Sequence, residues 1–145
     1  MALNLEMIQS MWEKDSKIDI DNLHTESLNI PSLHAKYFDL YNTIVLLRKN
    51  AEQQKRKIRH ERHQFYSGKA DPDVYIDEPF QKKIRDKNDM ERYLNADDKL
   101  SKVTLKVEYY DVMLKYIEDI LKQIHNRTYQ IKNSIEFMRF QSGLG

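Results

Sequence analysis

Apolar side chains recur at alternating steps of three and four residues over the last third of the chain, from Leu100 to Met138. A repeat of about 3.5 residues that persists over several heptads is typical of a long, coiled-coil-like helix. A second apolar stripe, from Tyr109 to Ile120, lies beside the first. We therefore predict a short helix followed by a long helix within residues 87–142.

A similar repeat begins at Leu33 and continues to Leu47, after which the same register becomes basic. It predicts a second long helix over residues 31–67, apolar in its first half and charged in its second. Residues 1–30 are expected to form an N-terminal helical segment, which begins with Asn4 as a helix cap. Residues 68–86 contain Pro72, Pro79 and several acids, and we expect an acidic linker there.

The composition agrees with an all-α fold in a single domain over residues 1–145. The chain has only three Gly and three Pro, and 32% of its residues are charged, a composition that favours helices. Because there is no cysteine, disulfides, thiol nucleophiles and cysteine zinc sites are excluded. No apolar run approaches the length of about 20 residues that a membrane span needs, and the N-terminus lacks the pattern of a signal peptide. An intracellular protein without a membrane partner is expected.

Two long helices do not make a compact globule by themselves, so their apolar faces must be covered by each other and by further subunits. We expect the final helix to build a homo-oligomer. The predicted interface consists of Leu114, Ile117, Leu121, Ile124, Ile131, Ile135 and Met138.

Positive charge is concentrated in residues 48–69. This stretch holds eight Lys and Arg against two acids, whereas the rest of the chain carries 16 basic and 21 acidic side chains. At helical spacing the basic side chains form two neighbouring rows, one of Arg48, Lys55, Arg59 and Arg62 and the other of Lys49, Arg56, His60 and His63. A charge localised in this way indicates a surface that binds a polyanion.

Phe65 and Tyr66 follow the basic rows, and Gly68 is expected to end the helix. Cations beside aromatic rings suit single-stranded nucleic acid, because phosphates bind the cations and unstacked bases lie on the rings. We predict DNA contacts from Arg48, Lys49, Lys55, Arg56, Lys57, Arg59, His60, Arg62, His63, Tyr66 and Lys69. The alternative is a helix whose basic side chains are simply solvated.

No catalytic residues, metal ligands or cofactor are predicted. His60 and His63 are three residues apart, whereas the zinc-protease helix needs a spacing of four. The acids of residues 71–78 match no calcium loop. A solvated linker is the simpler interpretation of this acidic segment, and a flap that competes with DNA for the basic helix is the alternative.

Several motifs resemble the UvsY family, the recombination mediators of T-even-like phages. The basic helix runs into Phe65-Tyr66-Ser67-Gly68-Lys69 and then Asp71-x-Asp73, which is similar to the family's YSG[R/K]-x-D-x-D segment. The Lys-Asp and Ile-Asp pairs of residues 14–21, the Leu94-x-Ala96-Asp97 turn and the closing stretch from Ile131 to Gly143 are similar as well. The resemblance covers nearly the whole chain.

The resemblance implies a non-enzymatic protein that acts on single-stranded DNA in the cytoplasm of an infected bacterial host. It implies a ring or open barrel of six or seven identical subunits, with seven favoured. It also implies two protein partners. The mediator would help a RecA-like phage recombinase (UvsX) displace the phage single-strand-binding protein.

The family's DNA contacts lie in a Lys-Ala-Arg-Leu motif before a pair of tyrosines. In this chain His60 stands at the position of the Lys, Arg62 at that of the Arg and His63 at that of the Leu. Phe65 and Tyr66 correspond to the tyrosine pair. His60 departs from the motif, and Arg56, Lys57 and Arg59 are the neighbouring cations that would replace the missing charge.

Two other classes of function remain open on the residues alone. One is a structural coiled-coil scaffold whose basic patch binds an acidic protein, and the other, ranked last, is a nuclease or another metal enzyme. RNA in place of DNA also stays open, since stacking and phosphate contacts hardly distinguish the two sugars.

Overall fold

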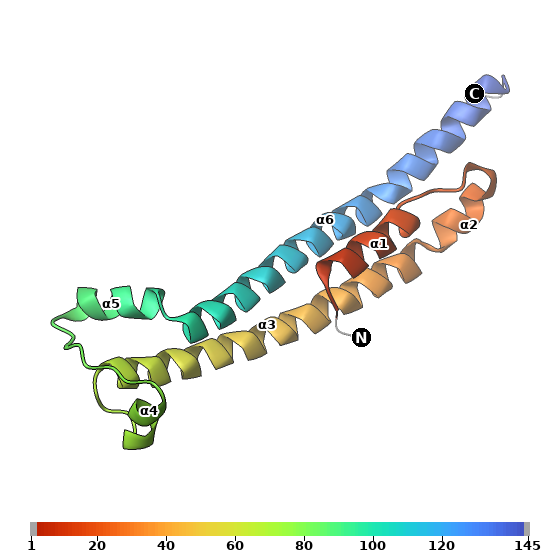
Figure 1. The fold of residues 1–145 in the computed structure, drawn as a ribbon. Helices are drawn as coiled ribbons and strands as arrows, with labels where there is room; N and C mark the ends of the chain where they lie inside the picture. Colours follow the sequence, from red (N-terminus) through yellow and green to blue (C-terminus); the bar gives the residue numbers. More distant parts are fainter. Residues whose placement is uncertain (1–2, 144–145) are drawn as a thin grey trace. The chain divides into compact units, whose positions relative to one another are not determined.

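A computed structural model describes residues 3–143, and within that range the elements are helices joined by loops, without a β-strand. The prediction of an all-α fold is confirmed. The elements are α1 (Leu5–Asp15), the 3-10 helix η1 (Ile20–Asn22), α2 (Leu23–Leu28), α3 (Ile30–Tyr66), α4 (Pro72–Asp77), α5 (Lys87–Asn95) and α6 (Asp98–Gln141). Figure 1 labels the α-helices.

The described chain divides into two compact units, and both long helices contribute to each. The first unit comprises the residues up to Val45 together with those from Val112 onward. The second unit is Leu46–Asp111. The expected positions of the long helices agree with α3 and α6, whose lengths are 37 and 44 residues.

In the first unit, α1 packs beside the first half of α3 and the second half of α6 (Figure 1). Asn4 caps α1, as predicted, by accepting a hydrogen bond of 2.7 Å from the backbone N–H of Met7. Trp12 meets Tyr37 of α3 edge to face, with ring centroids 5.5 Å apart. The Tyr37 hydroxyl donates to the carboxylate of Asp15 at the end of α1 over 2.8 Å. These contacts fix α1 on α3.

Arg127 lies in the buried row of α6, at a helical position where an apolar side chain is expected. It is 6% exposed. Its guanidinium donates to the backbone carbonyls of Asp15 and Lys17, each over 3.0 Å, and to the carboxylate of Glu26 over 2.9 Å. A charge this deeply buried needs such partners. Arg127 therefore joins α6 to the end of α1, to the loop that follows it and to α2.

In the second unit, α5 and the first turns of α6 pack on the second half of α3. The apolar core consists of Met90, Leu94, Leu100 and Val103, with Ile58, Tyr66 and Ile84 packed against it. Asp86 caps the N-terminus of α5, and Asp97 caps that of α6 by accepting from the backbone N–H of Leu100 over 2.8 Å. The turn between α5 and α6 is thereby fixed.

Gly68 ends α3, as the sequence predicts, and adopts a positive φ of 76°. The chain then forms α4 inside the segment expected to be a linker. Pro72 stands in the first turn of α4, where its missing N–H is tolerated. The Tyr75 hydroxyl donates to the backbone carbonyl of Phe65 over 2.7 Å, and the two rings stack with centroids 5.2 Å apart. The stacking of Tyr75 on the end of α3, a tertiary contact, explains why local sequence did not predict this helix.

Across residues 3–143, no helix is long and apolar enough to cross a membrane.

Candidate nucleic-acid interface

The two basic rows of α3 have different environments in the second unit. The row of Arg48, Lys55, Arg59 and Arg62 lies toward the rest of the unit and includes three arginines bound to carboxylates. The row of Lys49, Arg56, His60 and His63 is exposed. The two rows lie on different sides of one helix. Cations that are neighbours in the sequence therefore divide into a row that contacts carboxylates and a row that faces solvent.

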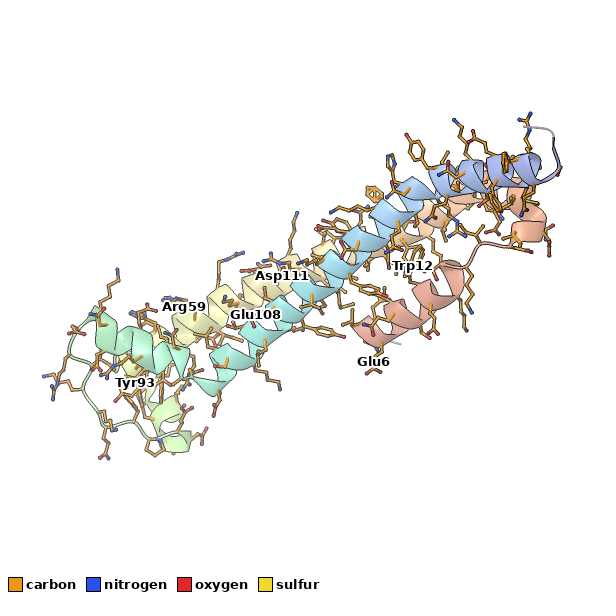
Figure 2. All side chains as sticks on the ribbon, turned by 90° about the horizontal axis from the view of Figure 1, so that it is seen from above. Glu6, Trp12, Arg59, Tyr93, Glu108 and Asp111 are labelled. Carbon is orange, nitrogen blue, oxygen red and sulfur yellow. The ribbon has the colours of Figure 1, made fainter. Side chains whose placement is uncertain are left out.

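Each arginine of the inward row has acidic partners. Arg48 is paired with Asp111 of α6 and lies 3.4 Å from Glu52. Arg59 donates to the carboxylate of Glu91 on α5 over 2.6 Å. Figure 2 labels Arg59 on α3 and Tyr93 on α5, both in the second unit. These ion pairs hold α5 and α6 on α3 and neutralise charge that would otherwise attract a polyanion.

Arg62 is the most buried of these cations and is 5% exposed. Its Nε donates to Asp97 over 2.6 Å, and its two terminal nitrogens donate to the carboxylate of Glu78 over 3.2 and 2.6 Å. The guanidinium also lies 4.1 Å from the centre of the Phe65 ring. The sequence suggested that Arg62 contacts DNA directly, but the structure places it in the core, where two acids supply the charge partners.

The pKa values of Arg62 and Asp97 are shifted by the same contacts. Burial alone would lower the pKa of Arg62, but hydrogen bonds with Glu78, Tyr66 and Asp97 outweigh it and raise that pKa further. Burial likewise opposes the ionised form of Asp97. Hydrogen bonds from the Leu100 N–H, Tyr66 and Arg62 together outweigh this effect of burial, so the pKa of Asp97 lies below its ordinary value. Both side chains are therefore charged, and each depends on the other.

The aromatic pair proposed to stack with bases belongs to an internal cluster. Phe65 is 2% exposed, and Tyr66 donates its hydroxyl to Asp97 over 2.7 Å. Both rings also pack on Phe80, with centroids 5.5 and 5.1 Å away, and Tyr66 packs on Tyr93. Faces covered in this way are not open to bases in this structure.

The exposed row, with Lys57 beside it, is the part of the predicted track that faces solvent. No acidic side chain among the described residues forms an ion pair with Lys49, Arg56 or Lys57. His60 and His63 are exposed on the same side of the helix. Lys55 is half-buried and lines a hollow with Arg59 and Glu108. The cations available to a ligand are therefore fewer than the sequence suggests, but they lie together.

Lys69, past the end of α3, lines a hollow of about 380 Å³ that His60 also lines. Lys99 of α6 contributes a further ammonium group to this hollow, and Glu61 and Asp71 contribute carboxylates. Lys69 and His60 of the exposed row therefore line the same hollow, and their contact with DNA stays a prediction.

The residues predicted to form the oligomer interface divide along α6. Ile117, Ile124 and Ile131 are 0%, 1% and 3% exposed and belong to the core of the first unit. Leu114 and Leu121 are half-buried. Ile135 and Met138 are 42% and 47% exposed, and Phe137 and Phe140 beside them are also exposed. The interface remains a prediction, and the exposed apolar surface lies at the C-terminal end of α6.

A second group of cations, not among the predicted DNA contacts, lies just before and at the start of α5 and consists of Lys82, Lys83, Arg85 and Lys87. The signal was present, because four basic residues occur within six positions, but nothing local linked them to α3. No group of three or more His, Cys, Asp or Glu side chains in the described chain is placed to hold a metal ion.

Comparison with known proteins gives a consistent result. The model of the family described as "Recombination, repair and ssDNA binding protein UvsY" matches residues 11–144. The recombination protein uvsY of Enterobacteria phage T4 is 27% identical over 141 residues, which cover 97% of this chain and 99% of that protein.

Solved structures agree with the sequence comparisons. The crystal structure of the bacteriophage T4 recombination mediator protein UvsY in lattice type II superposes with a TM-score of 0.85 at 27% identity, covering 97% of this chain and 99% of that one. The same protein in lattice type IV gives a TM-score of 0.82 at 25% identity, with 96% and 99% covered.

Proposed function

Because the chain belongs to the UvsY family of recombination, repair and single-stranded-DNA-binding proteins, we propose that it loads a RecA-like phage recombinase onto DNA coated with single-strand-binding protein. In this role the protein acts as a mediator and catalyses no reaction. It would work in the cytoplasm of the infected bacterial host. Its partners would be single-stranded DNA, the recombinase and the phage single-strand-binding protein.

The observation that supports DNA binding is the exposed row of α3. Lys49, Arg56 and Lys57 project cationic groups that no carboxylate neutralises within residues 3–143. Polyanion binding releases counterions in proportion to the phosphates contacted, so unpaired cations on one surface are the groups that contribute affinity. We assign the strand to this exposed side of α3.

We further propose that six or seven subunits, with seven favoured, assemble into a ring or open barrel. The exposed apolar residues Ile135, Phe137, Met138 and Phe140 at the end of α6 support an interface there. An assembly would repeat the α3 surface, and several weak sites on one strand raise the overall affinity through effective concentration. The count of subunits follows from the family resemblance.

Fluorescence anisotropy with labelled single- and double-stranded oligonucleotides at two salt concentrations, combined with light scattering, tests the DNA-binding part. We expect preference for the single strand, a steep loss of affinity with salt, and a mass several times the 17.5 kDa of one chain. Equal binding to both forms would indicate general polyanion affinity. A well-formed oligomer that binds no oligonucleotide would instead favour the scaffold with an acidic protein partner.

The mediator activity itself needs a separate assay. Recombinase filaments are allowed to form on single-stranded DNA already covered by single-strand-binding protein, and the lag before filament growth is measured. We expect the protein to shorten this lag, and to have a much smaller effect on uncoated DNA. An unchanged lag on the coated strand would contradict the proposed role even if DNA binding were found.

A further inference from the structure

A second group of exposed cations lies in the segment before α5, outside the basic helix. Lys82, Lys83, Arg85 and Lys87 are all exposed, and none of them forms an ion pair within the described chain. Four unpaired cations within six residues are a local concentration of charge comparable to that of the exposed row on α3.

The acids near these cations already have partners. The carboxylate of Asp89 accepts from Arg92 over 2.5 Å and from the backbone N–H of Arg85 over 3.1 Å. Asp86 caps α5 by accepting from the N–H of Asp89 over 2.8 Å. Glu91 holds Arg59 of α3. Arginines therefore compensate Asp89 and Glu91, and Asp86 is the one acid among residues 82–87. The lysines of the segment and Arg85 remain free to bind an external anion.

The fold brings this segment beside the end of α3. A hollow of about 410 Å³ is lined by His63 and by Arg59, paired with Glu91, from α3 and by Arg85 and Lys87 from the segment, with Asp86 as its other acid. Arg85 also lines a second hollow, of about 780 Å³, together with Lys82 and Lys83. Arg85 lines both hollows, so the two adjoin each other and connect His63 of α3 with Lys82 and Lys83.

The second hollow has the composition of a single-strand site. Lys82, Lys83 and Arg85 line it with unpaired positive charge, and the half-buried ring of Tyr93 forms part of its wall. The ion pair of Arg92 with Asp89 also lines this hollow. Flexible ammonium groups around an open, partly aromatic hollow match the alternation of phosphate and base in a single strand. A small-molecule pocket, in contrast, is mostly apolar and encloses its ligand.

We propose that residues 82–87 form a second stretch of the single-strand track, which continues from the exposed row of α3 through His63 and Arg85. The proposal rests on the proposed DNA-binding function and extends it. A strand that leaves α3 near His63 would cross the 410 Å³ hollow to Arg85 and then follow the 780 Å³ hollow along Lys83 and Lys82. Each subunit then covers more nucleotides than α3 alone would.

The test uses the full-length protein and labelled oligothymidylates of two lengths. The variant Lys82→Gln, Lys83→Gln, Arg85→Gln removes three charges without removing an ion pair, and its matched control is Lys102→Gln, Lys106→Gln, Lys115→Gln on exposed positions of α6. We expect the first variant to lose affinity for the long oligonucleotide but little for the short one. Its slope of log affinity against log salt should decrease by roughly 2, since each phosphate contact contributes about 0.7 for single strands.

The outcomes distinguish the inference from the function on which it rests. If Lys49→Gln, Arg56→Gln weakens binding and the 82–85 variant behaves like its control, the second stretch is wrong and the α3 site stands. If neither variant weakens binding, both proposals fail. Photo-crosslinking of substituted oligonucleotides gives an independent measurement. Crosslinks within residues 82–93 support the proposal, and crosslinks confined to α3 overturn it.

Discussion

Arg62 and Asp97, 35 residues apart in sequence, form a buried ion pair in which the guanidinium Nε donates to the carboxylate over 2.6 Å. The two residues are only 5% and 4% exposed. The same carboxylate caps α6 through Leu100 and accepts from the Tyr66 hydroxyl. One acid therefore connects the end of α3 with the start of α6, and the stability of the second unit depends on it.

Replacing Arg62 should mainly destabilise the fold. Arg62→Ala leaves Asp97 buried without its charge partner, and breaking a buried pair in this way costs about 3–5 kcal/mol. Chemical denaturation measures the loss. The matched control is Arg59→Ala, whose more exposed pair with Glu91 should contribute at most about 1 kcal/mol. A fully stable Arg62→Ala protein that had lost DNA affinity would instead restore Arg62 as a direct contact.

Acid should weaken the second unit through Asp97. The pKa of this carboxyl lies below its ordinary value of 3.8, so its contribution to stability is complete above that value and is lost as the pH falls through the lower, folded-state pKa. Asp97→Asn should lower stability at neutral pH and flatten its decline below pH 3.8. The midpoint of urea denaturation against pH measures both effects, and the exposed neighbour Asp98→Asn is the control.

Arg127 should contribute as much to the stability of the first unit as Arg62 does to that of the second. Arg127→Ala removes three hydrogen bonds to the α1–α2 region and leaves two backbone carbonyls without that donor, so we expect a loss of about 3 kcal/mol or more. Hydrogen exchange should rise in residues 5–28 before it rises elsewhere. The exposed Lys132→Ala on the same helix should leave both measurements unchanged. Unaltered exchange in the Arg127 variant would show that α1 and α2 are held by their other contacts, among them the hydrogen bond of Tyr37 to Asp15.

The exposed row of α3 should determine the salt dependence of DNA binding. Lys49→Gln, Arg56→Gln removes two unpaired cations, and the slope of log affinity against log salt should decrease by roughly 1.4 for each bound subunit. Light scattering should show an unchanged mass, since neither residue lies on α6. The same slope in variant and wild type would place the strand elsewhere.

The end of α6 should control assembly. Ile135→Glu, Met138→Glu places charges in the exposed apolar surface, and we expect a lower mass by light scattering with helical content preserved. DNA affinity should then fall as well, because the repeated sites no longer act together. Lys132→Glu on the exposed surface nearby serves as the control for added negative charge. A variant that keeps its full mass would exclude these two positions from the interface.

The helices were predictable because their signals are local and repeated. The heptads of α3 and α6, the cap at Asn4 and the stop at Gly68 all lie in the sequence around the element concerned. Helix α4 was not predicted, because Tyr75 stabilises it by packing on Phe65. This contact exists only after α3 has formed.

The candidate site was predictable as a region but not residue by residue. Charge density located the basic helix, yet it gave no means of separating Arg62 from Arg56, which occupy different sides of α3. The partners that decide this difference, Glu78 and Asp97, are 16 and 35 residues away from Arg62. The group at residues 82–87 was missed for the same reason, since its neighbours on α3 are known only from the fold.

Arginines and lysines are distributed differently in the second unit, and this would affect how a strand is bound. Arg48, Arg59 and Arg62 direct their planar groups to carboxylates inside the protein, while most of the cations that face solvent on α3 and the 82–87 segment are lysines. Arginine binds in fixed, often two-pronged orientations, whereas a lysine ammonium acts as a mobile point charge. If the proposed function holds, a strand bound mainly by lysines would be retained without a fixed register. It could then slide, and the proposed recombinase partner could displace its contacts one at a time.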